Sequence, residues 1–144
     1  MTAAYDTDFA AWADEQAELL RRRASNELDW ENLVEEIESL GRSQRHEVYS
    51  RLMRICEHLL KLAYQQRIDP PKSWMATITE QRAELERLFE DSPSLRPYAA
   101  AQLAKAYTNG RKFAAHYTTE LPAECPWTIE QVLDPEFWPQ PRSD

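Results

Sequence analysis

The chain has 144 residues, of which 25 are acidic and 17 basic, and its net charge is −8. This charge opposes general binding to nucleic acid or to an anionic membrane surface. We find neither a run of about 18 apolar residues nor a basic and apolar secretory leader, and therefore expect a cytoplasmic protein with no membrane association. Only two glycines occur. Because tight hairpins depend on turn glycines, this composition predicts long helices within one domain, residues 1–144.

The first predicted helix covers residues 6 to about 24. Asp6 or Thr7 can cap its start, since short polar side chains accept hydrogen bonds from the first free backbone N–H groups. Large side chains at spacings of three and four then mark one face, at Phe9, Trp12, Gln16, Leu19 and Leu20. This pattern predicts an amphipathic helix.

The second predicted helix is unusually long. Asp29 can cap it, and its apolar line advances 29 residues in eight steps from Leu33 to Leu62, which is the helical period. The helical phase of this apolar line does not change at Gly41. We therefore predict one continuous helix from about 30 to 66. The alternative is two helices that meet at Gly41, because glycine commonly ends a helix.

Two further helices are predicted after the prolines at 70–71. They cover about 74–90 and about 95–118, and a serine precedes each as a candidate cap, Ser73 or Ser94. Gly110 lies on the apolar line of the second of them. A glycine there predicts that the backbone of a neighbouring helix comes close.

Residues 119–144 hold five of the nine prolines and are predicted to wrap around the helices. Thr128 and Gln131 match a capping box, which predicts one short helix. Trp127, Phe137 and Trp138 are expected to anchor the segment. The predicted fold is an all-α bundle of four main helices, with one long central helix and this Pro/Trp-rich segment packed on it. Since the long helix exceeds its neighbours, we expect one apolar end of it to remain uncovered.

Several short motifs become specific when taken together. They are LDWENLVEEIESLGR at 28–42, HLLK at 58–61, SW at 73–74, QR at 81–82, DSPSL at 91–95, ECPW at 124–127 and FWP at 137–139. With these motifs the sequence resembles domain of unknown function 29, a family of small helical bacterial proteins, from Tyr5 to Pro139. The resemblance implies a mostly helical single domain. The resemblance implies no particular reaction, ligand or catalytic residue.

Polar side chains border the apolar line of the long helix. Glu36 lies between Leu33 and Leu40, and Asn32 is one turn before it; His58 and Lys61 stand in a similar relation to the later part of the line. One interpretation is an acid–base or ligand cluster, and the other, which we favour, is a set of hydrogen bonds and ion pairs that fix helix register. The candidate cluster comprises Asn32, Glu36, His58, Lys61, Tyr64, Trp74 and Arg82.

The common cofactor and metal motifs are missing from the sequence. None of the three histidines follows a glutamate at the Glu-x-x-His spacing, and Cys56 and Cys125 have no zinc-site spacing. We see no glycine-rich phosphate loop and no Gly-x-Ser-x-Gly. We therefore predict no metal and no cofactor, expect Cys56 to be a small buried hydrophobic residue, and find no sequence context that activates either thiol.

Three functional hypotheses follow. The leading one is a non-catalytic helical interaction module that binds a protein partner or a second copy of itself. The second is an enzyme or small-ligand-binding protein that uses the polar cluster. The third is nucleic-acid binding through two stretches, 42–67 and 94–117, which each carry a charge of +4. The overall acidity favours the view that these stretches instead face acidic helices of the same chain.

Overall fold

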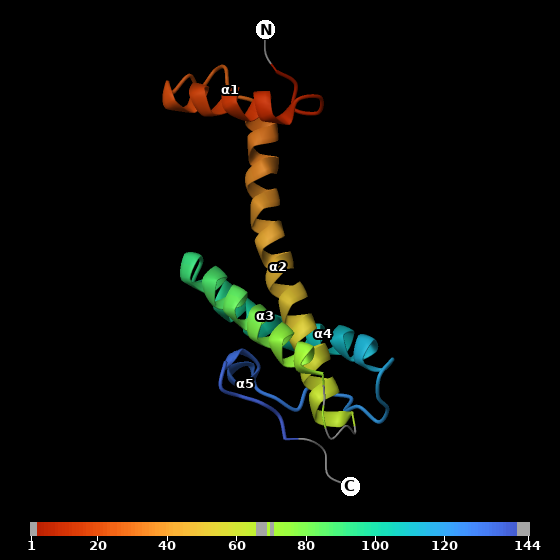
Figure 1. Ribbon diagram of the computed structural model, residues 1–144. Helices are drawn as coiled ribbons and strands as arrows, with labels where there is room; N and C mark the ends of the chain where they lie inside the picture. Colours follow the sequence, from red (N-terminus) through yellow and green to blue (C-terminus); the bar gives the residue numbers. More distant parts are fainter. Residues whose placement is uncertain (1–2, 66–68, 70, 141–144) are drawn as a thin grey trace. The chain divides into compact units, whose positions relative to one another are not determined.

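The computed structural model describes residues 3–65, 69 and 71–140, and within these ranges it contains helices and no strand. The helices are α1 (Phe9–Arg21), α2 (Trp30–Tyr64), α3 (Lys72–Asp91), α4 (Leu95–Ala114) and α5 (Ile129–Leu133) (Figure 1). The predicted all-α class is confirmed, including one long helix among shorter ones. Within the predicted single domain, the residues gather into two compact units, 1–43 and 44–144.

The long helix α2 runs through Gly41 without interruption, and this confirms the continuous form of the prediction. Asp29 caps its start: one carboxylate oxygen accepts from the Asn32 backbone N–H at 3.4 Å and the other from Asn32 Nδ2 at 2.7 Å. The helix ends at Tyr64, and the predicted end near residue 66 lies outside the described residues. Its first 14 residues belong to the N-terminal unit and the others to the C-terminal unit.

In the N-terminal unit, α1 lies across the N-terminal end of α2 (Figure 1). Two contacts to Asp29 join them: Trp12 Nε1 donates to the Asp29 carboxylate at 3.0 Å, and the Asp29 backbone N–H donates to Gln16 Oε1 at 2.8 Å. Trp12, Gln16 and Leu19 are buried here, as their spacing predicts. Phe9 and Leu20, from the same predicted face, are about half exposed.

The predicted start of α1 is wrong by about three residues. Asp8 caps the helix, with its Oδ1 accepting from the Ala11 N–H at 3.1 Å, whereas the predicted caps were Asp6 and Thr7. The three positions carry equally suitable side chains. Only the backbone path before the helix decides which of them reaches a free N–H group.

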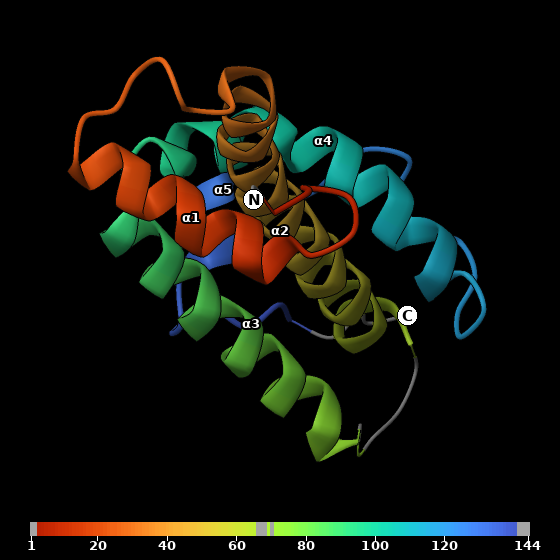
Figure 2. The ribbon, with the colours of Figure 1, turned by 90° about the horizontal axis from the view of Figure 1, so that it is seen from above.

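In the C-terminal unit, α3 and α4 lie on opposite sides of the second part of α2 (Figure 2). Each of the four helices in this unit contributes fully buried apolar side chains to one core. Its members include Val48, Leu52, Ile55 and Leu59 of α2, Ile78 and Leu85 of α3, Ala99 and Ala106 of α4, and Val132 of α5.

The close approach predicted at Gly110 is confirmed. A Cβ atom on Gly110 would come within 2.6 Å of the Met53 carbonyl oxygen and 3.1 Å of the Glu57 backbone nitrogen, both on α2. The buried face of α4 consists largely of small residues, including Ala106 and Ala114, and these let the two backbones come near. The predicted apolar position Phe113 is 51% exposed instead. The helix also ends at Ala114, earlier than predicted.

Neither predicted serine cap forms. Pro71 stands at the N-cap of α3, so that Ser73 lies inside the first turn, and Ser94 precedes α4 without a side-chain cap bond. Proline at this point needs no capping side chain to fix the backbone, because its ring already restricts φ.

The described part of the C-terminal segment packs on the core as predicted, and its last residues, 141–144, lie outside the described part of the chain. Thr128 and Gln131 form the capping box of α5, with reciprocal hydrogen bonds of 3.1 and 3.0 Å. Trp127 and Trp138 pack against the core of the C-terminal unit. No helix in the described part of the chain is both long and apolar enough to cross a membrane.

Candidate functional site

The structure distributes the predicted polar cluster over two units. Asn32 and Glu36 belong to the N-terminal unit, where Asn32 binds the capping Asp29 and Glu36 Oε2 accepts from the Tyr5 hydroxyl at 2.6 Å. The hydrogen bond to Glu36 raises the pKa of Tyr5 to about 12. Both residues thus fix the segments that adjoin α1 and the start of α2.

The structure brings together Lys61 and Trp74 in the C-terminal unit. Lys61 is buried, its Nζ lies 2.8 Å from Glu57 Oε2, and the ammonium also faces the rings of Tyr117 at 3.8 Å and Trp74 at 5.5 Å. A buried ammonium needs such an anion and such ring faces. The backbone carbonyl of Tyr64 accepts from the Thr118 hydroxyl at 3.0 Å, which holds the end of α2.

One ring nitrogen of His58 is hydrogen-bonded within its own helix. Its Nδ1 lies 2.9 Å from the Arg54 carbonyl oxygen, and because a carbonyl only accepts, the proton stands on Nδ1. Burial lowers the pKa of His58, so the ring is neutral at neutral pH. The side chain can therefore stay buried on α2 without a carboxylate partner.

Arg82 anchors the C-terminal segment. Its guanidinium donates to the carbonyl oxygens of Val132 at 2.8 Å, Phe137 at 2.9 Å and Gln131 at 3.3 Å, and it lies over the Trp138 ring. Burial lowers the pKa of Arg82 to about 10, while the charge of Asp134 acts in the opposite direction. Two of these carbonyls belong to α5, where a cation also suits the negative end of the helix dipole.

Several cations of the two basic stretches have partners within the fold. Arg51 pairs with Glu47 at 2.9 Å and also donates to Gln81, and Arg96 pairs with Glu86 at 2.7 Å. A further arginine of α4, Arg111, donates to the carbonyls of residues 121 and 122. Within the described ranges, no group of three His, Cys, Asp or Glu side chains is placed to hold a metal ion.

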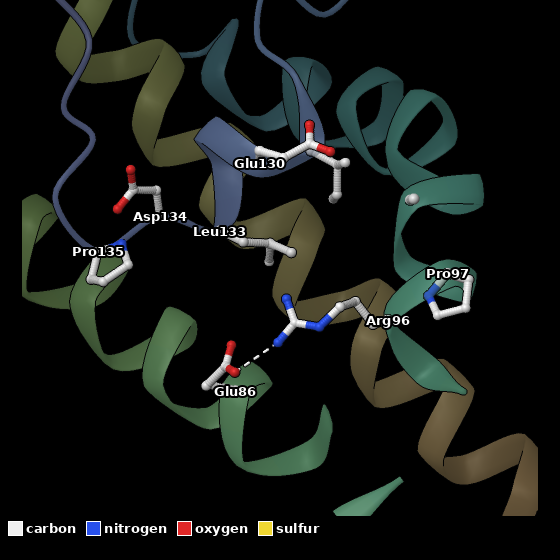
Figure 3. A pocket seen from close by; sticks show the side chains of 9 residues that line it. Glu86, Arg96, Pro97, Glu130, Leu133, Asp134 and Pro135 are labelled. Atoms are coloured by element: carbon white, nitrogen blue, oxygen red, sulfur yellow. Dashed lines mark hydrogen bonds and ion pairs between the residues drawn. The ribbon is translucent and has the colours of Figure 1, made fainter. Parts of the chain in front are cut away.

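A groove of about 570 Å³ opens between α3, α4 and α5 (Figure 3). Its walls are largely apolar, and its charged side chains are three carboxylates and one arginine. The arginine, Arg96, already contacts Glu86, while Glu130 and Asp134 come from α5 and the residue after it (Figure 3). The volume suits a small ligand, and the excess of carboxylates favours a cation.

The N-terminal part of α2 carries a second feature, which we call the α2 apolar face. It consists of large side chains that are more than half exposed: Trp30 at 57%, Val34 at 52%, Ile37 at 68% and Leu40 at 63%. Spacings of four, three and three residues place them on one side of the helix. The sequence placed Ile37 and Leu40 on the apolar line of the long helix, and their exposure agrees with the expectation that one apolar end of this helix remains uncovered.

Acidic residues surround the α2 apolar face. Residues 1–43 hold eleven acidic and four basic side chains, so this unit carries −7 of the chain's net charge of −8. Glu31 and Glu38 lie three and four residues from Val34 and are therefore its neighbours on the helix surface. Arg42 pairs with Glu35 at 2.9 Å and with Glu38 at 3.7 Å, but these groups are exposed and the pairs are weak.

The helices and the absence of strands in the described ranges define an all-α protein built on one long amphipathic helix. The chain belongs to the family described as domain of unknown function DUF29, whose profile matches residues 4–138. The family resemblance seen in the motifs is thereby confirmed. Comparison with curated proteins and with solved structures found no match.

Proposed function

We propose that the N-terminal unit is a protein-interaction module, and that the α2 apolar face binds an amphipathic helix of another protein whose polar edges carry Lys and Arg. The observation that carries this proposal is the set of four large apolar side chains, each more than half exposed, on one side of α2. Contiguous exposed apolar surface of this kind typically marks an interaction site.

The spacing of these side chains supports a helical partner. Helix-binding surfaces use anchors that repeat every three or four residues along one stripe, as Trp30, Val34 and Ile37 do. The indole N–H of Trp30 donates to the Ser25 carbonyl at 2.9 Å, so the largest anchor is already held in place. A pre-oriented aromatic side chain loses little conformational freedom on binding.

The charge of the unit supports a basic partner. A segment with Lys and Arg beside its apolar residues would meet the carboxylates next to Val34, and the attraction would speed association. A second copy of this chain would bring another charge of −7 to the same surface. Repulsion between like charges therefore disfavours self-association through this face.

A synthetic amphipathic peptide of Leu and Lys, labelled with fluorescein, tests the proposal by fluorescence anisotropy. We expect the full chain to bind it, and the double variant Ile37→Ser/Leu40→Ser to bind at least tenfold more weakly, because two anchors are lost. The matched control is Phe113→Ser, which removes an exposed apolar side chain from the other unit and leaves the affinity unchanged.

Two results would contradict the proposal. Equal binding by the double variant would show that the peptide responds only to net negative charge. Sedimentation equilibrium is the second measurement. Dimers of the wild type that dissociate in the Ile37→Ser/Leu40→Ser variant would identify a second copy as the occupant of the α2 apolar face.

A further inference from the structure

The groove between α3, α4 and α5 has apolar walls, and short side chains keep it open. Ile129 and Leu133 lie four residues apart on one side of α5, and both belong to the lining. Helix α4 contributes Pro97 and Ala100, which are short and exposed. A longer side chain at Ala100 would take up part of the volume of about 570 Å³.

An acidic stripe runs beside the apolar stripe of α5. Glu130 and the residue after the helix, Asp134, are also four residues apart and therefore neighbours. Glu86 of α3 adds a third carboxylate. Among the described residues that line the groove, Arg96 of α4 is the one cation, so the lining carries a formal charge of −2.

The three carboxylates are not equally engaged. Glu86 is paired with Arg96 at 2.7 Å, and Asp134 Oδ1 accepts from the Glu136 backbone N–H at 2.9 Å. The described part of the chain supplies neither a hydrogen bond nor an ion pair to the carboxylate of Glu130. Figure 3 shows Glu130 across from the pair of Arg96 and Glu86. Glu130 is thus available to a ligand in the groove.

The geometry points to a binding site for a small amphipathic amine, whose ammonium group pairs with Glu130 and Asp134 while its apolar body lies against Leu133 and Ala100. Charge complementarity identifies this occupant, because the lining attracts a cation and repels an anion. The site is independent of the α2 apolar face, which belongs to the other unit.

Arg96 directs the charge of the ligand to one end of the groove. Its guanidinium holds Glu86 and lies 4.8 Å from the centre of the Phe89 ring, so the charge of Glu86 is already neutralised. An anionic ligand would compete with Glu86 for Arg96 and would face the carboxylates of α5. A cationic ligand meets these carboxylates without displacing Arg96.

The arrangement suits an organic cation better than a metal ion. A hard metal ion needs several oxygen ligands at once. In the ranges that the structure describes, these carboxylates do not form a group that could hold one. An amine with an apolar body needs only one or two carboxylates, because the apolar walls supply much of its affinity.

Both parts of the site contribute to recognition. The carboxylates are exposed, and an exposed ion pair adds only a modest amount to affinity. Apolar contact binds the body of the ligand but does not distinguish an amine from an alcohol of the same shape. The ammonium group therefore sets the preference among ligands of one shape.

Three indole compounds of similar size test the inference: tryptamine is a cation at pH 7, tryptophol is neutral and indole-3-propionate is an anion. Each is titrated into the ¹⁵N-labelled full chain, and amide shifts report affinity and position. We expect saturable shifts for tryptamine around residues 96–100 and 129–135. Tryptophol should bind roughly fivefold more weakly, and indole-3-propionate more weakly still.

Two variants with matched controls separate the charge from the groove. Glu130→Gln should bring the affinities for tryptamine and tryptophol within about twofold of each other, whereas Glu90→Gln, an exposed position of α3 outside the lining, should leave the preference unchanged. Ala100→Phe fills the groove and should weaken tryptamine binding at least about tenfold. Ala101→Phe, exposed on the same helix but outside the lining, is its control.

The comparison of the three compounds uses the wild-type chain and decides the matter even if a variant fails to fold. Equal affinities for tryptamine and tryptophol would overturn the inference, as would shifts spread over acidic positions away from the groove. Tryptamine binding that survives Ala100→Phe unchanged would overturn it too. So would the lack of any saturable shift at millimolar tryptamine.

Discussion

Gly110 of α4 lies against the Met53 carbonyl of α2, so closely that a Cβ atom on Gly110 would come within 2.6 Å of that oxygen. The nearest atoms are backbone atoms and the Cβ of Cys56, none of which can rotate away. The missing side chain thus sets the distance between α2 and α4.

Gly110→Ala is expected to destabilise the protein by about 1–3 kcal/mol, because overpacking outweighs the gain of about 1 kcal/mol in helix propensity. Urea unfolding measures the change. Thr108→Ala, at an exposed position of the same helix, is the control and should change stability by no more than about 0.5 kcal/mol. A more stable Gly110→Ala variant would mean that the two helices are not in backbone contact.

Arg82→Met should cost about 2–4 kcal/mol, since it leaves three carbonyl acceptors without their donor. Amide hydrogen exchange should accelerate most around residues 131–137, because the Arg82 guanidinium binds the carbonyl groups of this segment. The control is Arg87→Met, which breaks an exposed pair with Glu84 and should cost less than about 1 kcal/mol. Equal losses in the two variants would deny Arg82 its anchoring role.

Arg23→Gly should stabilise the protein by about 0.5–1 kcal/mol. Arg23 follows α1 with φ of 55°, and its N–H donates to the Leu20 carbonyl while that of Ala24 reaches Leu19, which is the Schellman arrangement that glycine normally completes. Arg23→Ala keeps the Cβ atom, and with it the strain of the positive φ, but removes the charge. It should therefore change the stability little. If both variants behaved alike in thermal unfolding, charge rather than backbone conformation would be responsible.

Alkylation of Cys125 by iodoacetamide should reach half its maximal rate near pH 7, below the value of about 8.5 for an ordinary thiol. Rates rise with pH because the thiolate is the reacting form. In Cys56→Ala the pH at half-maximal alkylation rate should rise, because the interaction with Cys56 that lowers the pKa of Cys125 is lost. The same pH in wild type and variant would show that Cys56 does not lower the pKa of Cys125. Cys56 itself should stay unlabelled until the chain unfolds.

Local patterns predicted the features that depend on neighbouring residues. Unbroken periodicity across Gly41 gave one helix, the Thr128 and Gln131 pair gave the α5 cap, and glycine on an apolar line gave the close contact at Gly110. The N-caps Asp8 and Pro71 were missed because several adjacent residues could occupy the N-cap position. The path of the backbone before the helix decides which of them does.

Features that depend on distant contacts could not be predicted. Periodicity placed Ile37 on the apolar line of α2, and the excess length of this helix predicted that one end of the line stays uncovered, but not which end. Sequence placed Arg82 in a polar cluster, yet its partners are carbonyls some 50 residues later.

The α2 apolar face is the central claim, and NMR titration of the ¹⁵N-labelled full chain with the Leu/Lys peptide tests it most directly. We predict that amide shifts concentrate at residues 30–41, saturate with peptide concentration, and shrink in the Ile37→Ser/Leu40→Ser variant. Shifts spread over the acidic positions of both units, or confined to residues 44–140, would contradict the proposed interaction site.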